Sequence, residues 1–205
     1  IYRDRIRSLA QIQSRQDINL TGLGDADLIA IANKGGVTCV QVFFLRGGQN
    51  WGNRAFFPRH DKGAELADVL TAFLAQFYEN KQPPKEILLS EGIKEAKLLS
   101  EALSARAERK VALLIPKRGD KKRLIDLAKR NATEALDRRM AESASQTRLL
   151  NGVADAFDLD APPQRIEVYD NSHIQGKHAV GALIVAGPEG FIKNAYRKFN
   201  IASED

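Results

Sequence analysis

Asp170 is the residue whose type and position best suit chemistry. It ends the apolar strand pattern 165–170, where the alternation would otherwise carry a side chain into the interior. A carboxylate there costs desolvation free energy unless a cation or hydrogen bonds compensate. Carboxylates bind divalent ions, and a pair of ions can activate water against a phosphodiester. One aspartate cannot hold two ions, so Asp170 predicts part of a metal site.

The residues after Asp170 leave two interpretations open. Asp-Asn-Ser-His, 170–173, is also typical of a turn capped by its own side chains. His173 can equally be a structural or surface histidine. No Cys/His cluster suggests zinc, and Gly22-Leu23-Gly24 precedes a predicted strand instead of following one. A small-molecule enzyme with a glycine-rich phosphate loop therefore has little support.

The basic residues are concentrated in one segment. Residues 117–139 hold nine basic and four acidic side chains, a net +5 that equals the excess of the whole chain. Such clustering is typical of a surface that contacts phosphates, but a solvated helix face with local ion pairs has the same composition. The candidates for DNA-backbone contact are Arg46, Lys117, Arg118, Lys121, Lys122 and Arg123.

Length and composition favour an ordinary globular protein. The 205 residues are 43% hydrophobic and 28% charged, enough for one large domain or one domain plus part of another. Cys39 is the single cysteine and is expected to be a small buried hydrophobe. No apolar run reaches the ~18 residues of a membrane span, and no signal peptide is evident, which fits a cytoplasmic protein. The start without methionine and the end just after a strand pattern suggest an internal piece.

The element order indicates a mixed α/β fold. Three strand patterns joined by glycine-rich turns precede alternating helices and strands, giving β-β-β-α-β-α-β-α. This is the order of the ribonuclease-H-like fold. The expected strands are 28–32, 37–45, 50–57, 86–89 and 111–115, and the expected helices are 63–78, 93–107 and 119–140.

The three-strand pattern then begins again. A helix at 143–157 and a proline-containing linker at 158–164 precede strands expected at 165–170, 178–186 and 191–199. The chain is therefore predicted to hold one complete unit and the first three strands of a second. The proposed division is a helical segment 1–18, a central domain 19–142, a helix and linker 143–164, and a truncated domain 165–205.

Several motifs resemble those of the UvrC family of excision nucleases. Asp170, Ser172, His173 and Gly176 resemble the start of its endonuclease domain, as does Tyr196-Arg197-Lys198-Phe199. The stretches VQVFFLRGGQNWGNRAFFP and PKRGDKKRLIDLAKRNA resemble central motifs of the family, and YRDRIRSLAQIQ resembles the end of its UvrB-binding helical segment. The resemblance spans essentially the whole chain.

The resemblance implies an activity and a partial site. UvrC incises DNA on both sides of a lesion marked by UvrA and UvrB, using Mg²⁺ or Mn²⁺. Asp170 falls on the first catalytic and metal-binding aspartate, with Ser172, His173 and Gly176 as supporting motif residues. The remaining catalytic residues would lie beyond position 205, so this piece is expected to be inactive alone and to bind no metal. No membrane or small-molecule substrate is implied. Asn171 replaces an apolar residue, and its side chain should point away from Asp170.

The central unit carries a weaker version of the same pattern. Its first strand, 28–32, holds only Leu, Ile and Ala, and Glu91-Gly92 lies where an active domain would place Asp-Gly. We interpret it as a degenerate ribonuclease-H-like domain that positions DNA or other domains. The alternative is an unrelated α/β domain in which Glu91 caps the next helix. For the whole chain, the alternative is a non-catalytic module for DNA or protein binding in which Asp170 is structural.

Overall fold

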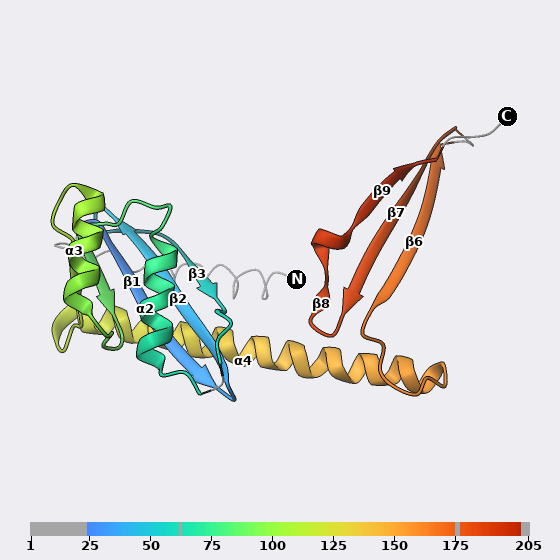
Figure 1. Cartoon of the computed structure of the whole chain (residues 1–205), viewed down its shortest axis with the longest axis horizontal. Coiled ribbons are helices and arrows are strands. Elements are labelled where there is room, and N and C mark those ends of the chain that lie inside the picture. The colour runs from blue at the N-terminus through green and yellow to red at the C-terminus, as the bar shows by residue number, and fades with distance from the viewer. Residues whose placement is uncertain (1–23, 62, 175–176, 202–205) are drawn as a thin grey trace, which may run out of the picture. The chain divides into compact units, whose positions relative to one another are not determined.

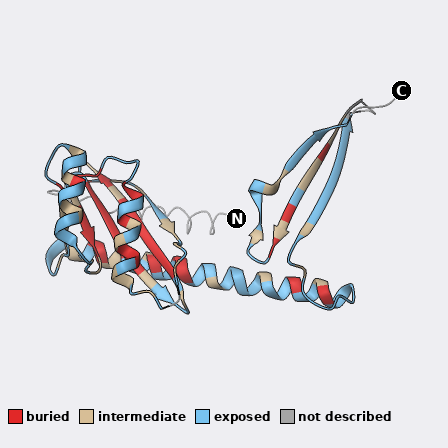
Figure 2. Cartoon of the chain, in the orientation of Figure 1, coloured by how far each residue is buried: buried red, intermediate tan, exposed pale blue. Residues whose placement is uncertain are grey.

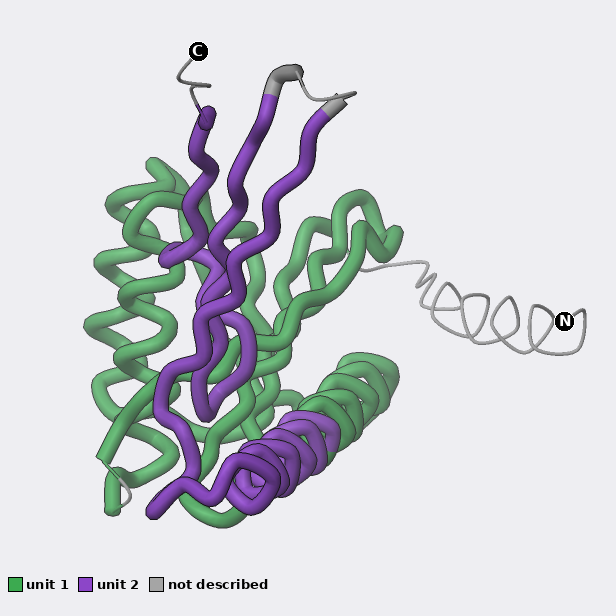
Figure 3. Tube along the Cα trace, turned by 90° about the vertical axis from the view of Figure 1, so that its right-hand side faces the viewer, with its two compact units in different colours: residues 1–137 green, residues 138–205 purple. Residues whose placement is uncertain are grey.

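The computed structural model describes residues 24–61, 63–174 and 177–201, so the predicted segment 1–18 lies outside the described residues. The chain forms two compact units, residues 1–137 (unit 1) and 138–205 (unit 2), which Figure 3 colours apart.

Unit 1 contains a five-stranded mixed sheet in the order β3-β2-β1-β4-β5 (Figure 1). The first three strands pair antiparallel, β4 runs parallel to β1, and β5 runs parallel to β4. The predicted order β-β-β-α-β-α-β-α and the mixed α/β class are confirmed. The strands are β1 (Ala26–Lys34), β2 (Val37–Arg46), β3 (Gln49–Phe56), β4 (Glu86–Leu89) and β5 (Ala112–Leu114).

Both hairpins of unit 1 close on glycine pairs. Gly35 and Gly36 have φ of 59° and 79°, and Gly47 and Gly48 have 57° and 75°. A two-residue turn with positive φ at both positions matches the right-handed twist of the flanking strands, and only glycine adopts it without steric cost. The turn residues therefore set the register of β1 against β2 and of β2 against β3.

Two hydrophobic layers cover the sheet of unit 1. Ile29 and Ile31 of β1 pack with helices α2 (Leu66–Phe77) and α3 (Ala96–Ala107). The intervening Leu28 and Ala30 instead pack with the first turns of α4, against Leu124, Ile125 and Ala128. Because side chains of a strand alternate between faces, a continuous apolar run in β1 is buried on both sides, as Figure 2 shows in red.

Helix α4 corrects the prediction of two separate helices at 119–140 and 143–157. It runs unbroken for 38 residues, Gly119–Ala156, through the boundary between the units. Residues 141–149 are nearly all exposed, so no buried stripe marks the helix there. They contain no proline or glycine, and their side chains are compatible with a helix, so the backbone hydrogen bonds of the helix continue through them.

Unit 2 is a hairpin with a broken third strand. β6 (Ile166–Ile174) and β7 (Lys177–Gly187) are antiparallel, and both β8 (Gly190–Phe191) and β9 (Arg197–Asn200) pair with β7. The expected single strand 191–199 is wrong, because a 3-10 turn, η1 (Lys193–Ala195), divides it. Ala186 of β7 pairs with Phe191, and Leu183 of β7 pairs with Arg197. These two pairs are three positions apart along β7 but six positions apart along the opposite segment. The extra residues leave the ladder as η1.

Candidate functional site

Asp170 lies inside strand β6 and not at its end as predicted. The strand continues to Ile174, and Asp170 pairs with Ala182 of β7. Its side chain is exposed, so the predicted desolvation cost does not arise in unit 2 as described. The strand is longer than its apolar pattern because β7 offers backbone partners as far as Ile174.

The alternation along β6 sorts the motif residues between two faces. Ser172 shares the face of Asp170, because positions two apart in a strand point the same way. Asn171 lies on the opposite face over Gly181, where an added Cβ would meet the Asn171 Oδ1 atom at 3.1 Å. Asn171 therefore points away from Asp170. His173 is exposed at the register shift after Ser172, and Gly176 lies outside the described residues.

The donor set around Asp170 fits one part of a divalent-metal site. Carboxylate and hydroxyl oxygens, from Asp170 and Ser172, are the hard ligands that Mg²⁺ and Mn²⁺ prefer. The other carboxylate near this point, Glu167, lies on the opposite face of β6, bonded by Arg165 Nε at 2.7 Å and the Tyr169 hydroxyl at 2.9 Å. Within the described ranges, no three Asp, Glu, His or Cys side chains gather where they could hold an ion.

Unit 1 has apolar residues at the position equivalent to Asp170. Asp170 precedes Ile174, the last residue of β6, by four positions. In β1, the residue four positions before Lys34 is Ala30. On the partner strands, Ala182 opposite Asp170 is five positions after Lys177, and the residue five positions after Val37 is Val42, which pairs with Ile29. Ala30 and Ile29 are both fully buried. Glu91 caps no helix, since α3 begins after Glu95; its Oε1 atom accepts from Lys129 Nζ at 2.7 Å.

A buried carboxylate that the sequence analysis missed lies at the start of β1. Asp27 is 1% exposed; its Oδ2 accepts from the Tyr78 hydroxyl and its Oδ1 from Arg46 Nη1, both at 2.7 Å. Burial raises the pKa of Asp27 although both donors oppose it, and burial next to Asp27 raises the pKa of Tyr78 well above its usual range. The sequence does hold a signal for this burial. Asp27 is two positions before Ile29 and four before Ile31, so in a strand all three side chains lie on one face.

This cluster accounts for Arg46, one of the predicted DNA contacts. Its Nη1 atom also donates to the backbone oxygens of Leu45 at 2.7 Å and Ala26 at 3.3 Å. The Arg46 side chain is 30% exposed. The charge of Arg46 therefore compensates the buried carboxylate of Asp27.

The other predicted basic contacts divide into paired and unpaired side chains. Lys121 Nζ lies 2.6 Å from Glu86 Oε2, Arg123 Nη1 lies 3.3 Å from Asp120 Oδ1, and Lys122 pairs with Asp126. Lys117 and Arg118 precede α4, are exposed, and form no ion pair with any residue that the structure describes. Three of the predicted contacts thus have acidic partners in the first turns of α4, while the two residues before the helix have none among the described residues.

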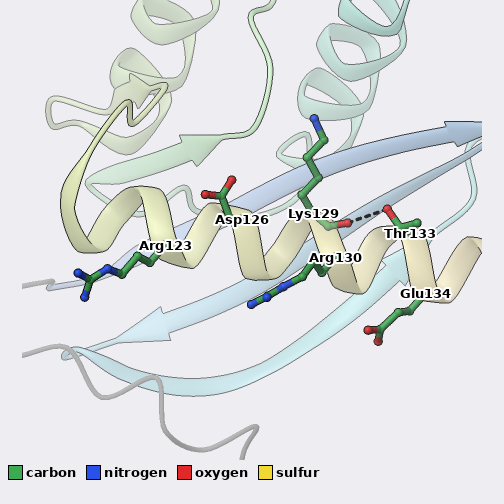
Figure 4. A pocket seen from close by; sticks show the side chains of 6 residues that line it. All are labelled: Arg123, Asp126, Lys129, Arg130, Thr133 and Glu134. Carbon is green, nitrogen blue, oxygen red and sulfur yellow. Dashed lines mark hydrogen bonds between the residues drawn. The ribbon is translucent and has the colours of Figure 1, made fainter.

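A pocket lies along α4 between Arg123 and Glu134 (Figure 4). Its described lining combines three cations, two carboxylates and a hydroxyl, so it does not present a single sign of charge to a ligand. The hydroxyl of Thr133 donates to the backbone oxygen of Lys129 at 3.1 Å. The lining residues are Arg123, Asp126, Lys129, Arg130, Thr133 and Glu134.

None of the described helices is long and apolar enough to cross a membrane. The 38 residues of α4 are long enough, but charged side chains recur along it.

Comparison with known proteins identifies the family. The model of the UvrC ribonuclease H-like domain matches residues 25–139, and that of the UvrC RNase H endonuclease domain matches residues 154–205. The UvrABC system proteins C of Ruegeria pomeroyi and Maricaulis maris are 60% and 62% identical over 203 residues, 99% of this chain. That of a Chelativorans species is 60% identical over all 205 residues. The chain spans about a third of these relatives: 33%, 32% and 31% of their lengths. The chain belongs to the UvrC family.

Proposed function

We propose that the chain forms the central part of a nuclease that incises damaged DNA by hydrolysing phosphodiester bonds. The observation that carries this proposal is the exposed Asp170 within residues 154–205, which match an endonuclease domain model. Asp170 is proposed as the first catalytic carboxylate. The rest of the catalytic set would come from the part of the relatives that this chain does not span.

The proposed role of Asp170 is to hold a divalent ion, Mg²⁺ or Mn²⁺. Such an ion, when bound, activates water and stabilises the charge that develops on the phosphate. Asp170 suits this role because it projects from a paired strand and not from a loop, so hydrogen bonds to β7 fix its backbone. Ser172, His173 and Gly176 are proposed to support this motif, with Ser172 on the same face of β6.

Unit 1 is proposed to be a degenerate ribonuclease-H-like domain with a positioning role. Buried Ala30 and Ile29 at the position equivalent to Asp170 support this, because neither can bind a metal. The proposed division is a UvrB-binding segment at 1–18, a central domain at 19–142, a connecting segment at 143–164 that contains the end of α4 and the linker, and the endonuclease domain from 165. The proposed partners are UvrB and DNA marked by UvrA and UvrB, in the cytoplasm.

A nicking assay tests the proposed division of the active site. The full-length hybrid is the Ruegeria pomeroyi relative in which the 203 matched residues are replaced by this chain. We expect the hybrid to incise lesion-bearing duplex in the presence of UvrA, UvrB and Mg²⁺, and residues 1–205 alone to produce no nicks with Mg²⁺ or Mn²⁺. One carboxylate cannot assemble a two-ion site. Nicking by the 205-residue chain alone, or an inactive hybrid beside an active relative, would contradict the proposal.

Lys117 and Arg118 are proposed to contact the DNA backbone, because they are exposed and unpaired among described residues. Replacing both by alanine should lower the slope of log affinity against log salt by up to about 2, since each phosphate contact contributes roughly 0.9. Fluorescence anisotropy with duplex DNA over a salt series measures this. The matched control replaces Arg106 and Lys110, which are also exposed. Equal slopes in the two double variants would remove Lys117 and Arg118 from the interface.

The alternative is a non-catalytic module that binds DNA or protein. The mixed charges around α4 favour the protein-binding form of this alternative. Three of the predicted DNA contacts there already have acidic partners, so their charge is less available to a phosphate. The hybrid distinguishes the two functions, because a module with a structural Asp170 would keep incision when that carboxylate is removed.

A further inference from the structure

The register of unit 2 places a cation in the same row of side chains as Asp170. Asp170 pairs with Ala182 of β7, and Ala182 pairs with Lys198 of β9. Residues directly opposite one another in an antiparallel sheet project from the same face. The strands β6, β7 and β9 lie side by side in Figure 1, so Asp170 and Lys198 face the same space across the width of the sheet.

The distance across this row suits a group held between the two charges. Neighbouring strands are about 4.8 Å apart, so the Cα atoms of Asp170 and Lys198 are separated by roughly 10 Å. Ala182 between them is half-buried and has the smallest side chain with a Cβ. Neither Asp170 nor Lys198 forms an ion pair with a residue in the described ranges, and both are exposed.

The next row on this face is also polar. Ser172 pairs with Val180, and Val180 pairs with Asn200. The face thus carries a carboxylate, a hydroxyl, an amide and an ammonium group around two small or β-branched residues. On the opposite face, the neighbouring cation Arg197 is already engaged, with its Nη1 atom 2.8 Å from Tyr196 O and 3.0 Å from Asn194 O.

We propose that Lys198 binds a DNA phosphate over Ala182, from the side opposite Asp170. This rests on the proposed nuclease function and adds a binding residue to it. A lysine ammonium is a compact charge on a flexible stem that binds phosphate without fixed geometry. It would hold the backbone against the Asp170 side of the sheet and would favour the added negative charge of the reacting phosphate.

The test uses Lys198→Gln, Lys198→Arg and the control Lys193→Gln in the full-length hybrid. Lys193 is exposed in η1 and has no described ion pair, so its replacement removes the same charge away from the Asp170 row. With a chelator present, Lys198→Gln should lower the slope of log affinity against log salt by about 0.9. With Mg²⁺, the incision rate should fall roughly tenfold or more, since bonds to charged groups are worth more than neutral ones. Lys198→Arg should restore most of both, and Lys193→Gln should match the unaltered hybrid.

The outcomes separate this proposal from the proposed function. If Lys198→Gln equals Lys193→Gln in both salt slope and incision while Asp170→Asn abolishes incision, the lysine proposal fails and the nuclease function stands. If Asp170→Asn also leaves incision unchanged, the proposed function itself fails. Circular dichroism and thermal unfolding check that each variant is folded. We expect folding to be retained, because substitutions of exposed side chains usually change stability little.

Discussion

Replacing Asp170 by asparagine in the full-length hybrid is expected to reduce incision by about 10³-fold or more. Asparagine has nearly the same shape but no negative charge, so it loses most of the attraction for a divalent ion. The loss of several kcal/mol of metal-based stabilisation corresponds to a factor of this order in rate. Single-turnover incision of an end-labelled, lesion-bearing duplex measures it. DNA affinity in a chelating buffer should stay within about threefold, because the lost contact requires the ion.

Glu167→Gln is the matched control for Asp170→Asn. Glu167 is a carboxylate on the same strand, three positions before Asp170 and on the opposite face. The Arg165 guanidinium and the Tyr169 hydroxyl lower the pKa of Glu167, so Glu167 is ionised near neutral pH. Removing its exposed charge should change incision by less than about threefold, because exposed pairs are worth about 1 kcal/mol or less. Equal loss in the two variants would assign Asp170 a structural role.

Replacing Asp27 by leucine is expected to lower the free energy of unfolding of unit 1 by about 3–5 kcal/mol. The substitution leaves the Tyr78 hydroxyl buried without its acceptor and removes the counter-charge of Arg46. A loss of that size is a large fraction of the ~5–15 kcal/mol stability of a typical domain. Urea unfolding followed by circular dichroism measures it, and an unchanged slope with denaturant would show that only stability has changed.

A double-mutant cycle with Tyr78→Phe tests the cause. If the buried hydroxyl is responsible, adding Tyr78→Phe to Asp27→Leu should recover roughly 1–3 kcal/mol, because removing both partners also removes the unpaired polar group. Tyr78→Phe alone should lower the free energy of unfolding of unit 1, because Asp27 then loses the hydrogen bond that the Tyr78 hydroxyl donates. Simple addition of the two losses would mean that the hydroxyl and carboxylate are not coupled, contrary to the 2.7 Å distance between them.

The local pattern of the chain predicted most of the fold. Apolar and β-branched runs between glycine turns predicted the first three strands, and helical spacing predicted α2, α3 and the start of α4. The errors lie where the pattern is weak. The polar stretch 141–149 has no hydrophobic periodicity, so the pattern predicts two helices where the structure has the single helix α4. The third strand of unit 2 was drawn as continuous because the length mismatch with β7 is visible only once the strands are paired.

The sequence predicted which residues belong to the candidate site but not what surrounds them. Asp170 was found from its place after an apolar run, yet its exposure depends on which neighbours cover β6. The basic segment was found from composition, but composition cannot distinguish Lys121, paired with Glu86, from the unpaired Lys117. Asp27 was missed because it stands next to a loop pattern and its burial is decided by Tyr78 and Arg46.

The sequence by itself determined the order of the elements of unit 1 and the glycine turns between its first three strands, because these depend on residues that are near one another along the chain. Tertiary structure alone decided the contacts of Asp27 with Tyr78, 51 positions away, and of Lys121 with Glu86, 35 positions away. It also decided that Lys198 shares a row with Asp170. Such pairs follow from strand register and helix placement, and a shift of one residue would move each side chain to the other face.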